Sequence, residues 1–116
     1  GLQFLRHIER TKVLLFLIDA NTDNPKKDFQ VLLNELKKYN KELLQKEKVI
    51  AFSKMDSVTE EKAKVLMKIN FGKNYPKPLG ISSISGYGIQ EMKFLLWEKV
   101  QYVRLLELSV EQEEKI

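Results

Sequence analysis

A lysine and an aspartate two residues apart follow an apolar segment of this chain, and this spacing suits recognition of a purine base. Ser53, Lys54, Met55 and Asp56 come directly after Val49–Phe52. A carboxylate held rigidly there can accept two hydrogen bonds from guanine, one from N1–H and one from the exocyclic amino group. Adenine presents a different edge and leaves the acid unpaired; a site built for such pairing rejects unpaired analogues by up to about 10⁴–10⁵. The aliphatic stem of the lysine can pack on the ring.

A second polar segment follows the apolar residues Leu79–Ile81. We expect Ser82, Ser83 and Ile84 to point backbone N–H groups at guanine O6, ahead of a glycine-rich turn. A Lys-x-Asp triplet alone is common, and an aspartate after a strand is often only an N-cap or turn residue. The order of strand, Ser-Lys-Met-Asp, helix, strand, Ser-Ser-Ile and helix favours guanine binding, because the two loops would then be neighbours.

Three repeats of strand and helix should position these loops. The continuous apolar run Val13–Ile18 is typical of a strand covered on both faces in a parallel sheet. An amphipathic helix should open at Asp28 and break near Asn40, while Leu43 and Leu44 extend its apolar face. That face comprises Phe29, Leu32, Leu33, Leu36 and Tyr39.

The second and third repeats have the same organisation. Val49–Phe52 predicts a short buried strand, and Ser57 or Thr59 can cap the helix after it. Leu79–Ser82 predicts a third strand, followed by a long helix over Ile89–Leu108. The predicted units are therefore 13–44, 49–70 and 79–108, with the end of a helix over residues 1–11. This pattern predicts an α/β fold with three parallel strands, in which ligands bind at the carboxyl ends of the strands.

The long last helix is apolar nearly all round, and such a helix needs cover on two sides. Three strands are also few for a doubly wound sheet. We therefore expect the chain to be part of a larger fold. An absent part of the parent protein, or a second copy of the chain, would cover Phe94 and Trp97. A homodimer could also form along the exposed first strand.

The composition excludes several classes of protein. The 116 residues contain no cysteine, so the chain is not a disulfide scaffold and has neither a thiolate zinc site nor a cysteine nucleophile. The single histidine, His7, is better read as a surface or packing residue than as a metal ligand. No apolar run reaches the ~20 residues of a membrane span, and no signal peptide is apparent, so we expect a cytoplasmic protein.

The net charge of +4 is mild, but it is unevenly distributed. Five lysines and no acid lie within Lys62–Lys77. Such a run is usually a solvated face, although it also suits a phosphate-rich partner. The alternative function is therefore a non-enzymatic α/β interaction module that binds RNA or a protein partner. Salt-dependent RNA binding that survives Asp56→Asn would favour that alternative.

Most of the chain resembles the Obg family of GTPases. The run Leu-Arg-His-Ile-Glu-Arg-Thr at residues 5–11 is specific to Obg proteins and their near relatives, whereas the Lys-x-Asp box is shared by GTPases generally. The segments that carry the resemblance are Gly1–Thr11, Val13–Ala20, Asn34–Asn40 with Leu43, Val49–Asp56 and Ile81–Ile89.

The resemblance implies a partial P-loop GTPase fold that binds GTP or GDP, with guanine contacts from Ser53, Lys54, Met55 and Asp56 and from Ser82, Ser83 and Ile84. It implies a cytoplasmic parent that uses magnesium to hydrolyse GTP to GDP and acts in assembly of the large ribosomal subunit, with that subunit or its rRNA as partner. Ser53 replaces the usual Asn, which should cost on the order of 1 kcal/mol of binding. Ser83 replaces the usual Ala and should be nearly neutral.

The chain lacks other parts that the family uses. It contains no G-x-x-x-x-G-K-[ST] loop, no D-x-x-G motif and no switch threonine or magnesium ligands. Residues 1–116 therefore resemble the carboxyl-terminal half of an Obg-type GTPase domain. We expect no catalytic residue and no metal ligand in this segment, and weak nucleotide binding without the amino-terminal half.

Overall fold

The computed structural model describes residues 10–115 of the chain, and the side chains of residues 10–109. The helix end predicted over residues 1–11 lies, for residues 1–9, outside the described part. So does His7.

A three-stranded parallel sheet forms the centre of the described structure, in the order β1 (Val13–Asp19), β2 (Glu47–Ser53) and β3 (Leu79–Gly80). This confirms the predicted α/β class with parallel strands. The strand β2 is longer than predicted, while β3 is shorter. Although the N–H of Ile81 still donates to the carbonyl O of Phe52 at 2.8 Å, its own carbonyl accepts from Met55, so the chain leaves the sheet there.

The two faces of β1 differ in burial, contrary to the expectation of cover on both. Leu14, Phe16 and Ile18 are buried, but Leu17 on the opposite face is 52% exposed. The central strand β2 is different, because Lys48–Phe52 are buried without a break. The rule that parallel strands are covered on both faces thus holds for the middle strand and not for the edge strand of the described part.

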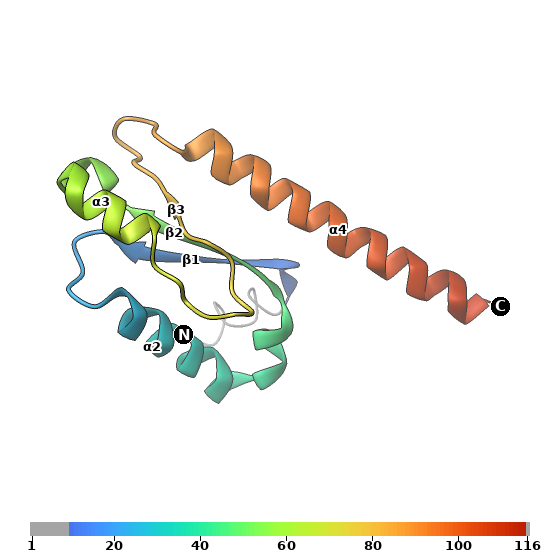
Figure 1. The fold of residues 1–116 in the computed structure, drawn as a ribbon. Coiled ribbons are helices and arrows are strands. Elements are labelled where there is room, and N and C mark those ends of the chain that lie inside the picture. Colours follow the sequence, from blue (N-terminus) through green and yellow to red (C-terminus); the bar gives the residue numbers. More distant parts are fainter. Residues whose placement is uncertain (1–9, 116) are drawn as a thin grey trace.

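Helix α2 (Pro25–Tyr39) lies against one face of the sheet (Figure 1). It begins three residues before the predicted start at Asp28, because Asn24 Oδ1 accepts from the N–H of Lys27 and Pro25 takes the first position. It ends at Tyr39, so the predicted break at Asn40 is confirmed. The short helix η1 (Lys41–Gln45) then buries Leu43.

The predicted apolar face of α2 is only partly buried: Phe29, Leu33 and Leu36 lie in the core, while Leu32 is exposed. Phe29 makes edge-to-face contacts with Phe16, Phe71 and Tyr75 at ring-centroid distances of 5.0–5.2 Å. Two of these rings come from the loop after α3, which therefore helps to cover the face of the sheet beside α2.

Helix α3 (Glu60–Met67) is capped by Thr59, whose Oγ1 accepts from the N–H of Lys62 at 3.1 Å. Of the two predicted caps, Thr59 is therefore the one used, and Ser57 belongs to the preceding short helix η2 (Met55–Ser57). The helix ends at Met67, three residues before the predicted end of the unit. Ile69 lies beyond it but still packs on the core.

Helix α4 (Ile89–Lys115) lies on the other face of the sheet, and its carboxyl-terminal part extends beyond the strands (Figure 1). It is longer than the predicted Ile89–Leu108. Two ion pairs hold it in place: Lys99 pairs with Glu47 of β2 at 3.4 Å, and Glu107 pairs with Lys12, the residue before β1, at 2.8 Å. None of the helices in the described part is long and apolar enough to cross a membrane.

The outward side of α4 carries large apolar side chains that remain more than half exposed. They include Phe94 and Trp97, whose rings stack at a centroid distance of 6.2 Å. The described residues thus cover this helix on one side only. What covers the other side stays a prediction.

Candidate functional site

The carboxyl ends of the three strands bring three loops side by side. The N–H of Ala20, after β1, donates to the carbonyl O of Ser53 at 2.9 Å. The N–H of Met55, after β2, donates to the carbonyl O of Ile81 at 3.1 Å. Parallel strands end at the same edge of their sheet, so these backbone bonds follow from the topology. The two loops that the sequence singled out are therefore neighbours, as the spacing predicts.

The carboxylate of Asp56 is held by a buried serine. The hydroxyl of Ser82, which is 1% exposed, donates to Asp56 Oδ1 at 2.6 Å and accepts from the N–H of Ser85 at 3.3 Å. A hydrogen bond to a carboxylate is about twice as strong as one between neutral groups. Asp56 itself is exposed, so its carboxylate is fixed at one oxygen and open to solvent. The site thus presents a fixed hydrogen-bond acceptor that is accessible from solvent.

The backbone of Ser82 does not have the role that the sequence suggested. Its N–H donates to the carbonyl O of Tyr87 at 3.0 Å, and its carbonyl accepts from the N–H of Gly86 at 2.9 Å. Both bonds close the turn before α4, so this N–H cannot point at a base. Ser82 contributes through its hydroxyl instead. Ser83 and Ile84 are exposed at the tip of the loop.

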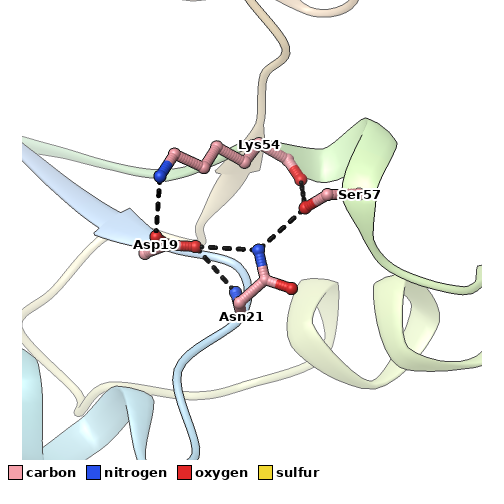
Figure 2. Close-up of polar contacts among 4 residues, drawn as sticks. All are labelled: Asp19, Asn21, Lys54 and Ser57. Atoms are coloured by element: carbon pink, nitrogen blue, oxygen red, sulfur yellow. Dashed lines mark hydrogen bonds and ion pairs between the residues drawn. The ribbon is translucent and has the colours of Figure 1, made fainter.

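Lys54 is the one described residue other than glycine with a positive φ; its backbone is left-handed, at φ 60° and ψ 36°. Its Nζ lies 3.2 Å from Asp19 Oδ2, at the end of β1. The carbonyl O of Lys54 accepts from the hydroxyl of Ser57 at 2.7 Å. Both ends of the lysine are thus held by other residues (Figure 2).

Asn21 connects the two loops around this lysine. Its Nδ2 donates to Ser57 Oγ at 2.8 Å, and its N–H donates to Asp19 Oδ1 at 2.9 Å (Figure 2). The backbone N–H of Asn21, then its side chain, and then Lys54 lower the pKa of Asp19 below its ordinary value, so this carboxyl is ionised at neutral pH. Asp19 and Asn21 follow the apolar run Val13–Ile18 along the chain, but the sequence alone assigned them no role. An acid and an amide two residues apart at the end of a predicted strand was the available signal.

Ser53 and Met55 complete the segment after β2. Ser53 is half-buried at the end of the strand, where its carbonyl holds the loop after β1. Met55 is buried, and its side chain packs on Gly80 of β3. The Met55 side chain is therefore part of the core, and its burial holds the backbone between Lys54 and Asp56 in place.

A shallow, open pocket of about 330 Å³ lies beside the carboxylate of Asp56. Both apolar and polar residues line it. The lining residues are Met55, Asp56, Val58, Glu60, Ala63, Ser82, Ser85 and Tyr87. Lys54 is not among the residues that line this pocket.

The described residues include no group of three or more His, Asp or Glu side chains that could hold a metal ion. What residues 10–115 offer is a fixed carboxylate with a flanking lysine.

No protein-family model matches the chain. It is, however, 47% identical over 100 residues to GTPase Obg of Parabacteroides distasonis and 43% identical over 100 residues to GTPase Obg of Phocaeicola vulgatus; each match covers 86% of this chain and 25% of the relative. GTPase Obg of Cytophaga hutchinsonii is 43% identical over 100 residues, covering 84% of this chain and 28% of the relative. The chain thus spans about a quarter of the length of the curated relatives that it matches.

Proposed function

Because this chain belongs by sequence to the Obg family of GTPases and corresponds to a segment of its members, we propose that its site recognises the guanine base of GTP or GDP. The observation that carries the proposal is the carboxylate of Asp56, held at 2.6 Å by Ser82 next to the anchored Lys54. Residues 1–116 are then the carboxyl-terminal half of the GTPase domain.

Asp56 reads the base by accepting two hydrogen bonds, from guanine N1–H and from the exocyclic amino group. Since Ser82 already fixes the carboxylate, little ordering of the side chain remains to be done when the base arrives. Adenine has an unprotonated N1 and no amino group at C2, so it would leave the carboxylate desolvated and unpaired. Guanine is therefore selected by what adenine cannot donate.

The remaining residues shape the contact around Asp56. The stem of Lys54 packs on one face of the base. Ser53, in place of the usual Asn, keeps one hydrogen bond, at a cost on the order of 1 kcal/mol. The loop of Ser83 and Ile84 closes over O6 with backbone N–H groups.

The parent protein would use this site as one half of a GTPase. Its amino-terminal half would hold the phosphate loop and the magnesium ligands, and a magnesium ion held there would supply charge neutralisation for phosphoryl transfer. We propose that the parent is a cytoplasmic hydrolase that acts in assembly of the large ribosomal subunit, with that subunit or its rRNA as partner. The segment alone is not catalytic and binds nucleotide weakly, because the phosphates have no cradle.

Titration of the ¹⁵N-labelled chain with guanosine and adenosine monophosphates tests base recognition. We expect amide resonances of residues 53–56 and 82–85 to shift with the guanine nucleotide and much less with the adenine nucleotide. In Asp56→Asn the new amide can donate to the C2 carbonyl of xanthine, so the preference should change from guanosine to xanthosine monophosphate. Asp23→Asn, at an exposed acid in the neighbouring loop, is the control and should keep the guanine preference.

Equal shifts with guanine and adenine nucleotides, or an unchanged preference in Asp56→Asn, would refute the proposal. Fluorescent GDP and GTP test the separate claim that the phosphate half is required. We expect poor binding of both by the chain alone; micromolar affinity would contradict that claim.

A further inference from the structure

The backbone of Lys54 lies in a conformation that disfavours any residue with a β-carbon. Its φ of 60° is the left-handed region, and isolated strained positions of this kind persist where the surrounding structure imposes them. Here the Ser57 hydroxyl holds the Lys54 carbonyl at 2.7 Å, and Asp19 holds the ammonium at 3.2 Å. Glycine would adopt this backbone more easily, so the lysine side chain must be useful there.

The ion pair between Lys54 and Asp19 adds little to stability. The two side chains are 66% and 46% exposed, and pairs at such exposure are screened by water and contribute little. The pair does, however, determine the direction in which the Lys54 side chain extends. It draws the ammonium toward the end of β1 and extends the four-carbon stem between Asp19 and the backbone next to Asp56.

Asp19 is itself fixed by its neighbour. The N–H and Nδ2 of Asn21 donate to Asp19 Oδ1 at 2.9 and 3.1 Å, which leaves Oδ2 for the lysine. The second Nδ2 contact of Asn21, to Ser57, closes a ring of contacts around the lysine (Figure 2). Three residues, Asp19, Asn21 and Ser57, thus hold Lys54 at its ammonium and at its backbone carbonyl.

We propose that Asp19, oriented by Asn21, is a positioning residue that holds the Lys54 stem in place as one wall of the base site before the nucleotide binds. This inference rests on the proposed function and names how that site is organised. Asp19 does not touch the base. It acts through Lys54, so that the rotamers of a long side chain need not be ordered when the ligand arrives.

The test compares Asp19→Asn with Asp23→Asn, which removes the same charge from the loop directly after β1. We expect Asp19→Asn to raise the Kd for guanosine monophosphate about three- to tenfold, the range for ordering one long side chain. Asp23→Asn should leave the Kd unchanged, and urea unfolding midpoints of both variants should match the wild type. In a Lys54→Met background, which keeps an unbranched apolar stem without the charge, Asp19→Asn should have no further effect.

An equal rise in Kd from Asp19→Asn in the Lys54→Met background would overturn the inference, because Asp19 would then act without the lysine. So would an unchanged Kd in Asp19→Asn. ¹³C relaxation of the Lys54 Cε group without ligand gives an independent measure: it should report a more mobile stem in Asp19→Asn than in the wild type. If the wild type shows no guanine preference, the proposed function fails, whereas equal Cε mobility in both proteins refutes the positioning role alone.

Discussion

Two glycines in the turn before α4 share a backbone conformation but differ in the space around them. Gly86 has φ +80° and Gly88 has φ +71°. A β-carbon on Gly86 would meet nothing within 4 Å, whereas one on Gly88 would lie 2.0 Å from the carbonyl O of Gly80 in β3. Alanine at the two positions therefore separates the effect of backbone strain from that of a steric clash with the sheet.

The expected magnitudes follow from these two contributions. Gly86→Ala should cost about 1–2 kcal/mol of the free energy of unfolding, because alanine is strained at positive φ. Gly88→Ala carries the same strain. In addition, the carbonyl O of Gly80 must move from 2.0 Å to at least 3.4 Å from the new β-carbon, which is ordinary contact. Overpacking of this kind adds about 1–3 kcal/mol, so the total should be about 2–5 kcal/mol. That is a large share of the stability of a small domain.

Urea unfolding followed by circular dichroism at a common temperature measures both losses. Gly88→Ala should also broaden or shift the amide resonances of Ile81 and Ser82, since the displaced Gly80 precedes them. Equal destabilisation by the two alanines would refute the reasoning, because the clash would then contribute nothing. A Gly88→Ala protein more stable than Gly86→Ala would refute it more strongly.

Three further predictions concern single side chains. Ser82→Ala removes the hydroxyl that holds Asp56, so it should cost about 1–2 kcal/mol of the free energy of unfolding and weaken the preference for guanosine over adenosine monophosphate. Ser83→Ala, at an exposed serine, is the control and should change neither the stability nor the nucleotide preference. Thr59→Ala removes the cap of α3 and should cost about 1 kcal/mol in urea unfolding, and a loss within error would contradict the assigned cap. Burial lowers the pKa of Lys48 below the ordinary 10.5, so the folded state releases this proton more readily than the unfolded state. The wild type should therefore gain stability relative to Lys48→Met as pH rises from neutral toward 10.5. Urea unfolding midpoints of the two proteins measure this difference, and a difference that falls with pH would contradict the prediction.

Much of the fold was predictable from short windows of sequence. The continuous apolar run at Val13–Ile18 and the shorter one at Val49–Phe52 predict β1 and β2, because buried parallel strands need no polar alternation. Asn40 ends α2 as predicted, because its side chain accepts a hydrogen bond from the backbone N–H of Glu42 and this local bond competes with continuation of the helix. Boundaries were less predictable. The start of α2 depended on the Asn24 cap rather than on the apolar pattern.

The candidate site divides in the same way. The positions of Lys54 and Asp56 after one strand, and of Ser82 after the next, could be derived from order along the chain, because parallel strands bring their carboxyl ends together. The role of Ser82 could not. Whether its N–H or its hydroxyl meets the site depends on the turn that Tyr87 and Gly86 close, and no short window of sequence encodes that turn.

By itself, then, the sequence determined the α/β class, the order of the elements and the loops that carry the polar residues, because periodicity and local propensity act over a few residues. The tertiary structure alone decided which polar groups meet: Asp19 with Lys54, 35 residues apart, and Ser82 with Asp56, 26 residues apart. It also decided that Leu17 and the outward side of α4 lie uncovered in the described part. Such pairings depend on strand register and backbone direction, which arise only when distant segments pack together.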